Sequence, residues 1–318
     1  MAERKRRRRK EGQRFSLPIA LICITVFVFT VMEKTGVIQL TLPPERPKDT
    51  TAGELTGESQ LEIHFLDVGQ GDCTLIICDG QTMLIDAGDN SQGTAVRMYL
   101  MKQGITTIDY VIGTHPDSDH IGGLDVVLYN FDCNMILLPD ASKDTQTYDD
   151  VIQTMENKYY KSIVPEQGAT YTLGQASFTI LSSSDIDYGD NANNASIALM
   201  LVHGTNKFLF TGDCEEEAEA DMLRSGQELK ADVYKVAHHG SKTASTEEFM
   251  QEVCPTYAVI SCGEDNKYGH PHAEVLNRLR GMHVQLFRTD EQGAIIMKSD
   301  GKNITANCSP SESWQAGE

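Results

Sequence analysis

The chain has 318 residues, of which 40% are hydrophobic, 26 are glycine and 10 are proline. This composition excludes collagen-like and repetitive proteins and supplies enough apolar side chains for one large core or two small ones. Residues 1–50 hold 11 Lys and Arg against 5 Asp and Glu, which leaves 16 basic and 41 acidic residues, a charge of −25, for the remainder. Such an acidic surface favours solubility and repels polyanions unless a basic patch or a bound cation intervenes.

The N-terminus differs from the rest of the chain. Residues 1–14 are a basic run, and Phe15–Met32 is an uncharged segment close to the length that crosses a bilayer. We predict a single-pass cell-membrane anchor at residues 15–32, with the basic tail cytoplasmic and the catalytic domain extracellular by the positive-inside rule. A cleaved signal peptide, which would give a secreted protein, is the alternative, although no small-x-small cleavage site follows. Residues 33–60 read as a linker, residues 61–308 as the domain and residues 309–318 as a disordered tail.

The domain begins with strands and continues with alternating helices and strands. The first three strands, separated by turn residues, predict a β-meander, and a second meander follows later in the chain. The predicted strands of the two meanders are residues 61–69, 72–80, 82–88, 169–183, 195–204 and 206–213. Helices are predicted at residues 94–104, 122–130, 147–160, 215–226, 246–253 and 273–281. Further strands are predicted at residues 108–114, 134–139, 231–241, 256–263, 284–289 and 293–299. Two meanders, each followed by helices, predict two sheets packed face to face with helices outside, an αββα sandwich.

Polar side chains cluster directly after several predicted strands. The stretch THPDSDHIGG follows one strand, and TGD, HHG and GHPH follow three others. The candidate site residues in these stretches are His115, Asp117, Asp119, His120, Asp213, His238, His239, His270 and His272. Because the ends of neighbouring strands meet at one sheet edge, these residues can face one cavity. Imidazole and carboxylate without cysteine suit zinc, manganese or iron, in one or two divalent ions that activate water and clamp a phosphate.

Simpler explanations exist for single residues. PDSD alone is typical of an Asx turn, and Asp213 could cap a helix whose first turn is acidic. His64, His203 and His283 lie in or next to strands and read as structural. Seven cysteines follow the apolar segment without a regular spacing, so they read as buried hydrophobes, with one or two disulfides left open.

The motifs resemble those of a known family. HPDSDH resembles the H-x-H-x-D-H signature of the metallo-β-lactamase-fold hydrolases. FLDVGQGDCTLI, MLIDAG, FTGD, VYKVAHHGS and YGHPH are similar, in order, to the hydrolase domain at the C-terminus of ComEC-type competence proteins and its stand-alone relatives. The resemblance covers about residues 61–300 and implies the same αββα fold.

The resemblance also implies residue roles. The implied metal ligands are His115, Asp117, Asp119, His120, Asp213 in a bridging position, and His239. A proton donor or substrate contact would come from His238, His239, His270 and His272, with the division among them left open. Asp86 would orient a ligand histidine, and the other supporting residues are Asp67, Asp72 and Asn194.

Two departures from the signature weaken the first metal position. Asp117 replaces the second histidine, and the histidine expected before TGD is missing, since that segment offers only Asn194 and Ser196. We therefore expect one or two divalent ions, Zn²⁺ or Mn²⁺.

The leading hypothesis is a membrane-anchored, outward-facing metal-dependent hydrolase of a phosphodiester or related ester, and the family suggests a DNA nuclease of the DNA-uptake type. Lys235, Lys242 and Lys267 are the candidate DNA contacts.

One alternative is an envelope phosphodiesterase acting on a teichoic-acid or phosphocholine-like substrate. Others are a non-catalytic metal-holding protein and a cytoplasmic hydrolase. No partner protein is identifiable. ComEC-type proteins carry many membrane spans, whereas this sequence has one apolar segment.

Overall fold

The computed structural model describes residues 59–317. The predicted basic tail and anchor, and almost all of the predicted linker, lie outside the described residues, so the anchor stays a prediction. Within residues 59–317, no helix combines the length and the hydropathy that a membrane span requires.

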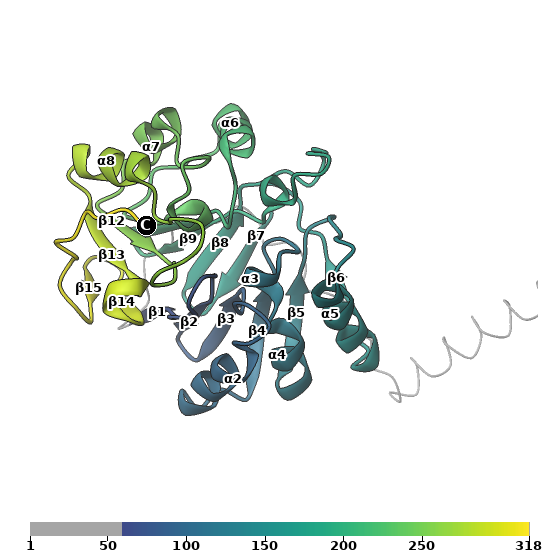
Figure 1. Ribbon diagram of the computed structural model, residues 1–318. Coiled ribbons are helices and arrows are strands. Elements are labelled where there is room, and N and C mark those ends of the chain that lie inside the picture. Colours follow the sequence, from purple (N-terminus) through teal and green to yellow (C-terminus); the bar gives the residue numbers. More distant parts are fainter. Residues whose placement is uncertain (1–58, 318) are drawn as a thin grey trace, which may run out of the picture. The chain divides into compact units, whose positions relative to one another are not determined.

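The first sheet is built mainly by the first half of the domain (Figure 1). Within the described residues it has eight strands in the order β15-β14-β1-β2-β3-β4-β5-β6. Its strands are β1 (Leu61–Phe65), β2 (Thr74–Cys78), β3 (Gln81–Ile85), β4 (Thr107–Ile112), β5 (Asp132–Leu137), β6 (Ser162–Ile163), β14 (Ile295–Ser299) and β15 (Ile304–Ala306). The predicted meander is β1 to β3, and β3 to β6 run parallel. The helices of this half are α2 (Gly93–Lys102), α3 (Ser118–Ile121), α4 (Leu124–Asn130) and α5 (Gln146–Asn157).

The second sheet has seven strands in the described residues, in the order β13-β12-β11-β10-β9-β8-β7. They are β7 (Thr170–Leu173), β8 (Ala176–Ile180), β9 (Leu199–His203), β10 (Asn206–Phe210), β11 (Val233–Lys235), β12 (Tyr257–Ile260) and β13 (Gln285–Arg288). The second meander is β7 to β10, and β10 to β13 run parallel. The helices and 3₁₀ turns are η1 (Ala192–Ala195), α6 (Glu216–Ser225), η2 (Ala237–Gly240), α7 (Glu247–Val253), α8 (Ala273–Gly281) and α9 (Thr289–Gln292).

Three buried clusters hold the layers together. One lies between the sheets, where Phe65 of β1 and Phe210 of β10 stack at 6.1 Å. A second joins the first sheet to α2, α4 and α5, and a third joins the second sheet to α6, α7 and α8. The predicted αββα sandwich is confirmed. Because both faces of each sheet are covered, its central strands are largely apolar on both sides.

The loops that carry the candidate site residues follow β3, β4, β10, β11 and β12. Because β3 and β4 are parallel, as are β10 to β12, the carboxyl ends of the strands within each set share one edge. A further loop, between β1 and β2, reaches the same edge, where the backbone N–H of Asp72 donates to the carbonyl of Asp119 at 3.0 Å. Gly71 makes this approach possible, since a Cβ there would lie 2.4 Å from that carbonyl oxygen and φ is +150°.

The C-terminal segment differs from the sequence prediction. The sequence predicts a disordered tail, whereas residues 309–317 form backbone hydrogen bonds to the domain. The N–H of Ser311 donates to Leu286 at 2.7 Å, and that of Gly317 donates to Pro271 at 3.1 Å. Trp314 packs against the cluster under α6 to α8, and its apolar ring is the physical reason for the ordering.

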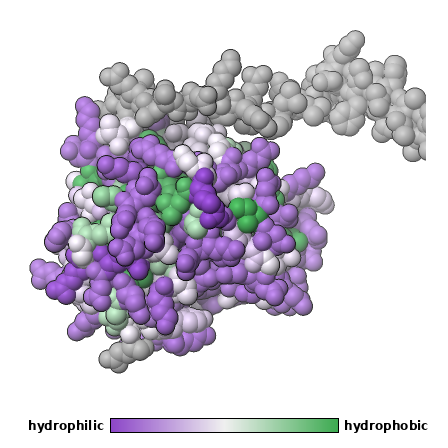
Figure 2. All heavy atoms as spheres, turned by 90° about the horizontal axis from the view of Figure 1, so that it is seen from above, coloured by the Kyte–Doolittle hydropathy of each residue, from purple (hydrophilic) through white to green (hydrophobic). Residues whose placement is uncertain are grey.

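The surface of the domain is polar, and most of its cysteines are buried. The face in Figure 2 is largely hydrophilic, with apolar side chains exposed in small patches. All seven cysteines of residues 59–317 are free thiols, and five of them are buried.

Candidate metal centre

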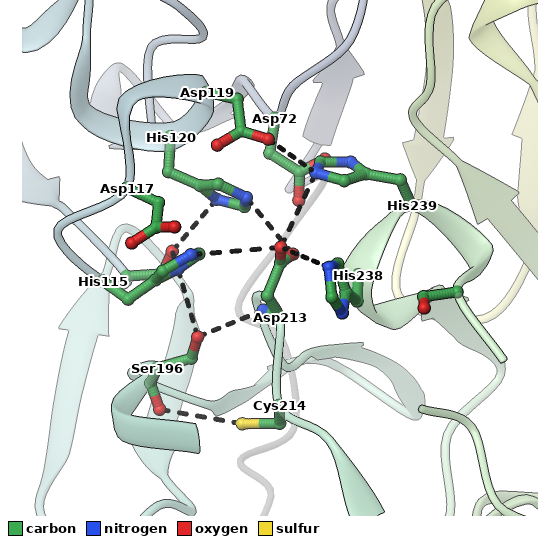
Figure 3. A network of polar contacts seen from close by, with 12 residues as sticks. Asp72, His115, Asp117, Asp119, His120, Ser196, Asp213, Cys214, His238 and His239 are labelled. Atoms are coloured by element: carbon green, nitrogen blue, oxygen red, sulfur yellow. Dashed lines mark hydrogen bonds and ion pairs between the residues drawn. The ribbon is translucent and has the colours of Figure 1, made fainter. Parts of the chain in front are cut away.

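Four histidines surround the carboxylate of Asp213 (Figure 3). Asp213 follows β10 and is buried. Its carboxylate oxygens lie 3.2 Å from Nε2 of His120, 3.6 Å from Nε2 of His239, 3.8 Å from Nε2 of His238 and 3.9 Å from Nε2 of His115. The loops after β4, β10 and β11 therefore meet around one carboxylate.

The other ring nitrogen of each buried histidine is held by the protein. Nδ1 of His120 lies 2.8 Å from Oδ2 of Asp86, and Nδ1 of His239 lies 2.9 Å from the carbonyl oxygen of Ser261. A carbonyl oxygen only accepts hydrogen bonds, so Nδ1 of His239 is the donor and Nε2 turns toward Asp213. This support by carboxylate and carbonyl is the usual arrangement behind a metal-ligating histidine.

His115 is held by two hydroxyl groups. Its Nδ1 lies 3.2 Å from Oγ1 of Thr114 and 3.2 Å from Oγ of Ser196. The same Ser196 oxygen accepts a hydrogen bond from the backbone N–H of Asp213 at 3.1 Å. Thr114 in turn donates to Asp86 at 2.7 Å. Ser196 therefore ties the loop after β4 to the loop after β10.

Several buried atoms of this cluster lack a hydrogen-bond partner within the described residues. They are Nε2 of His115, His120 and His239, Oδ1 of Asp213 and Oδ1 of Asp72. Buried polar atoms are normally paired, so a set of orphaned nitrogen and carboxylate atoms needs an explanation. Asp72, His120, Asp213 and His239 each offer one such ligand atom, all within 4.8 Å of one another. Imidazole nitrogen and carboxylate oxygen are ligands of divalent transition metals, so these residues fit such an ion.

The electrostatics of the cluster favour a cation. Burial acts to lower the pKa of His120, but the carboxylates of Asp213 and Asp86 outweigh it and hold that pKa well above its ordinary value. Burial also acts to lower the pKa of His239, but the carboxylates of Asp213 and Asp72 outweigh it and raise that pKa to about 10. Without a metal ion, these carboxylates favour the protonated histidines. A bound divalent ion would supply the positive charge instead, so metal binding would release protons here.

Asp119 and Asp117 behave differently although both belong to the HPDSDH turn. Oδ2 of Asp119 lies 3.4 Å from Nε2 of His239, and this contact lowers the pKa of Asp119 to about 2 against the raising effect of burial. Both oxygens of Asp117 lie 2.7 Å from Nζ of Lys143. Asp119 therefore faces the cluster directly, whereas the charge of Asp117 is shared with a lysine.

A buried ion pair lies beneath the cluster. Nζ of Lys235, at the end of β11, is 2.7 Å from Oδ2 of Asp72, whose Oδ1 is 3.4 Å from Nδ1 of His239. Lys235 and Asp72 are only 3% and 5% exposed. The prediction of Lys235 as a DNA contact is wrong, because its ammonium is committed to a buried carboxylate.

The turn carrying His238 and His239 is strained. Their φ angles are +49° and +54°, the left-handed region that costs non-glycine residues energy. The strain aims both rings at Asp213 and sets Nδ1 of His238 3.2 Å from Oε1 of Glu215. From the sequence, Glu215 is only part of the acidic start of the helix after Asp213, and its position two residues after Asp213 is the one signal of a role in the site.

His270 and His272 form the outer wall of the site. His270 is buried, with its ring 5.5 Å from that of His238 and 6.0 Å from that of His239. Burial, then the neighbouring histidines, lower the pKa of His270 to about 4. His272 lies further out, and its Nδ1 accepts a hydrogen bond from the backbone N–H of Lys242 at 3.0 Å.

Two predicted supporting residues lie at the margin. Asp67 is exposed and accepts a hydrogen bond from the N–H of Gly69, as in an Asx turn. Asn194 is buried, and its Oδ1 accepts from the N–H of Glu215 at 2.8 Å. Asn194, which lies in η1, therefore supports the backbone of Glu215. It is connected to the cluster through Glu215.

Comparison with known proteins identifies related chains. Residues 66–264 match the profile of a family described as the metallo-beta-lactamase superfamily. ComE operon protein 3 of Bacillus subtilis is 31% identical over 255 residues, which cover 74% of this chain and 33% of that protein. Recombination protein 2 of Haemophilus influenzae is 29% identical over 288 residues, which cover 89% of this chain and 31% of that protein. The chain thus spans about a third of the length of these relatives.

Among solved structures, the metallo-beta-lactamase fold protein YhfI of Bacillus subtilis superposes with a TM-score of 0.51 at 13% identity. The match covers 76% of this chain and all of that one. At 13% identity, this likeness shows a shared fold alone.

Proposed function

Because the chain belongs to the metallo-beta-lactamase superfamily, we propose that it is a metal-dependent hydrolase of phosphodiesters and that DNA is its substrate. The observation that carries the proposal is the set of orphaned Nε2 atoms directed at Asp213. His120, His239 and Asp213 would hold a divalent ion, Mn²⁺ or Zn²⁺. Asp119, 3.4 Å from Nε2 of His239, would be the fourth ligand in place of Asp72, whose carboxylate is paired with Lys235. Such an ion, when bound, makes water a better nucleophile near neutral pH and stabilises negative charge on phosphoryl oxygens.

His238 is the residue placed to donate a proton to the leaving group. Its side chain is 21% exposed, so it lies where the buried cluster opens to solvent. Glu215 accepts from Nδ1, which leaves Nε2 facing the space above Asp213. Glu215 is itself fixed, since Oγ1 of Thr243 donates to it at 2.6 Å and Nδ2 of Asn191 at 2.8 Å. An imidazole oriented by a carboxylate is a common general acid.

The rim of the site supports a nucleic-acid substrate. Tyr268 is 51% exposed and stacks on His270 with ring centroids 5.6 Å apart. Nζ of Lys267 lies 4.9 Å from the centre of the Tyr268 ring, and Lys242 is exposed beside His272. Exposed aromatic rings stack bases of single strands, and neighbouring lysines bind phosphates. The similarity to Recombination protein 2 of Haemophilus influenzae also supports a DNA substrate.

An envelope phosphodiester is the second candidate, and the acidic surface favours it. The charge of −25 beyond residue 50 disfavours long polyanions, whereas a choline-bearing ester is less anionic. The exposed ring of Tyr268 also suits a quaternary ammonium group.

A substrate comparison tests the proposal. The purified full chain is incubated with single-stranded DNA, duplex DNA, bis(p-nitrophenyl) phosphate and a phosphocholine diester, with and without chelator. We expect hydrolysis of the simple diester and of single-stranded DNA, loss of both on chelation, and recovery on adding Mn²⁺ or Zn²⁺. Cleavage of the phosphocholine diester alone would favour the envelope substrate. No hydrolysis of any substrate with either metal would leave a non-catalytic metal-holding protein.

We also propose that residues 15–32 anchor the chain with the domain outside the cell. The support is the eight Lys and Arg residues that precede this uncharged segment. Protease added to intact cells should remove the domain and leave a short membrane-bound fragment. Recovery of the full-length chain from the cytosol would contradict this arrangement.

A further inference from the structure

The HPDSDH turn carries one carboxylate that is paired with a lysine. Asp117 precedes α3 at its N-cap position, yet its side chain makes no capping hydrogen bond. Both of its oxygens instead contact Nζ of Lys143 at 2.7 Å. The adjacent ammonium neutralises the charge of this carboxylate and repels a second cation, so Asp117 binds a metal ion less strongly than a free carboxylate would.

We propose that Lys143 replaces a second metal ion in this site, so that its ammonium is the cation bound by Asp117. The site would then combine one tightly held divalent ion, at His120, His239 and Asp213, with one protein ammonium. The inference rests on the proposed metal site, and its test measures how many ions bind, independently of hydrolysis.

The remaining groups near Asp117 are too few to hold an ion. His115 lies beside Asp117 in Figure 3 and directs Nε2 at Asp213. Ser196 occupies the segment where a further imidazole would complete the set, and its hydroxyl is used by Nδ1 of His115 and the N–H of Asp213. With Asp117 paired to Lys143, only one imidazole and the shared Asp213 remain, whereas stable sites have at least three protein ligands.

The loop between β5 and α5 brings Lys143 next to Asp117. Pro139 and Ala141 of that loop line the same small cavity as His115 and Pro116. The Lys143 side chain is 43% exposed, so its ammonium is also accessible to a phosphoryl oxygen of a bound substrate. A lysine serves as a compact point charge in such contacts.

The number of Mn²⁺ ions bound tests the inference. The full chain is purified in detergent, stripped of metal, and titrated with Mn²⁺ by calorimetry and by electron paramagnetic resonance, which reports coupled ion pairs. We expect one tight ion in the wild type. Lys143→Met should bind a second ion at least about tenfold more tightly than the wild type, because a like charge next to the position is removed. Lys143→Met combined with Asp117→Asn should return to one ion.

Lys207→Met is the matched control. Lys207 forms another exposed ion pair, with Nζ 2.6 Å from Oε1 of Glu228, and it lies near the start of β10, away from the end that carries Asp213. This variant should bind one ion, as the wild type does. Two tight ions in the wild type, or a single ion in Lys143→Met, would overturn the inference while leaving the proposed hydrolysis intact. A complete lack of binding in every variant would overturn both.

Discussion

Oε1 of Glu215 lies 3.2 Å from Nδ1 of His238, and this contact directs the opposite ring nitrogen of His238 toward Asp213. The contact with His238 is also the largest cause of the fall in the pKa of Glu215 to about 2. Glu215 is therefore ionised across the neutral range and holds the imidazole of His238 in this orientation.

This pair predicts a dependence on the leaving group. His238→Ala should lower kcat by about 100-fold for substrates with alkoxide leaving groups, a typical contribution of a general acid. With nitrophenolate, which leaves without protonation, the loss should be less than about tenfold. Glu215→Gln should show the same pattern more weakly, because the amide still contacts the ring. Equal losses for both leaving groups would assign His238 to another role.

Removal of the central carboxylates should separate metal binding from folding. Asp213→Ala should abolish both metal content and activity, because no neighbouring group replaces the carboxylate at the centre of the cluster. Asp119→Ala should lower both while the circular dichroism spectrum stays unchanged, since Asp119 lies outside the apolar clusters. Asp149→Ala, an exposed carboxylate in the first turn of α5, is the control. Full metal content in the Asp213 variant would refute the assignment.

The buried Lys235–Asp72 pair should matter for stability. Lys235→Met leaves the buried Asp72 carboxylate with only its longer contact to His239, which costs about 3–5 kcal/mol. Lys235→Met combined with Asp72→Asn removes both charges and should recover part of this loss. Urea unfolding of the two variants measures the difference. A cost below about 1 kcal/mol for the single variant would mean that water reaches Asp72.

The buried carboxyl group of Glu219 predicts that stability depends on pH through a group outside the metal centre. It is buried in α6, and its two oxygens accept hydrogen bonds from the backbone N–H groups of Ser245 and Thr246 at 2.5 and 2.8 Å. Burial raises its pKa above 4.5 although these hydrogen bonds oppose the rise. The folded protein therefore keeps this proton longer than the unfolded chain, and stability should fall as pH rises from 4.5 through the raised pKa.

The comparison with Glu219→Gln isolates this titration. The free energy of unfolding of the wild type, measured relative to that of the Gln variant, should decrease with pH across that interval and level off above it. An increase over the same interval would mean that the hydrogen bonds to Ser245 and Thr246 outweigh burial.

The sequence predicts the fold and the meeting of the site loops well, because both depend on local patterns. Apolar strands and amphipathic helices alternate along the chain, and HPDSDH, TGD and HHG each follow a strand. The partners of Asp117 and Asp72 could not be predicted. Lys143 reaches Asp117 from a loop 26 residues later, and Lys235 reaches Asp72 across 163 residues, so only the packed sheets bring them together.

The position of a bound ion tests the central claim most directly. Crystals of the wild-type chain are soaked in Mn²⁺, and an anomalous difference map is calculated. We predict one strong peak roughly 2.0–2.3 Å from Nε2 of His120, Nε2 of His239 and a carboxylate oxygen of Asp213. Anomalous peaks confined to exposed carboxylates, with none beside Asp213, would contradict the metal centre and the hydrolytic function proposed from it.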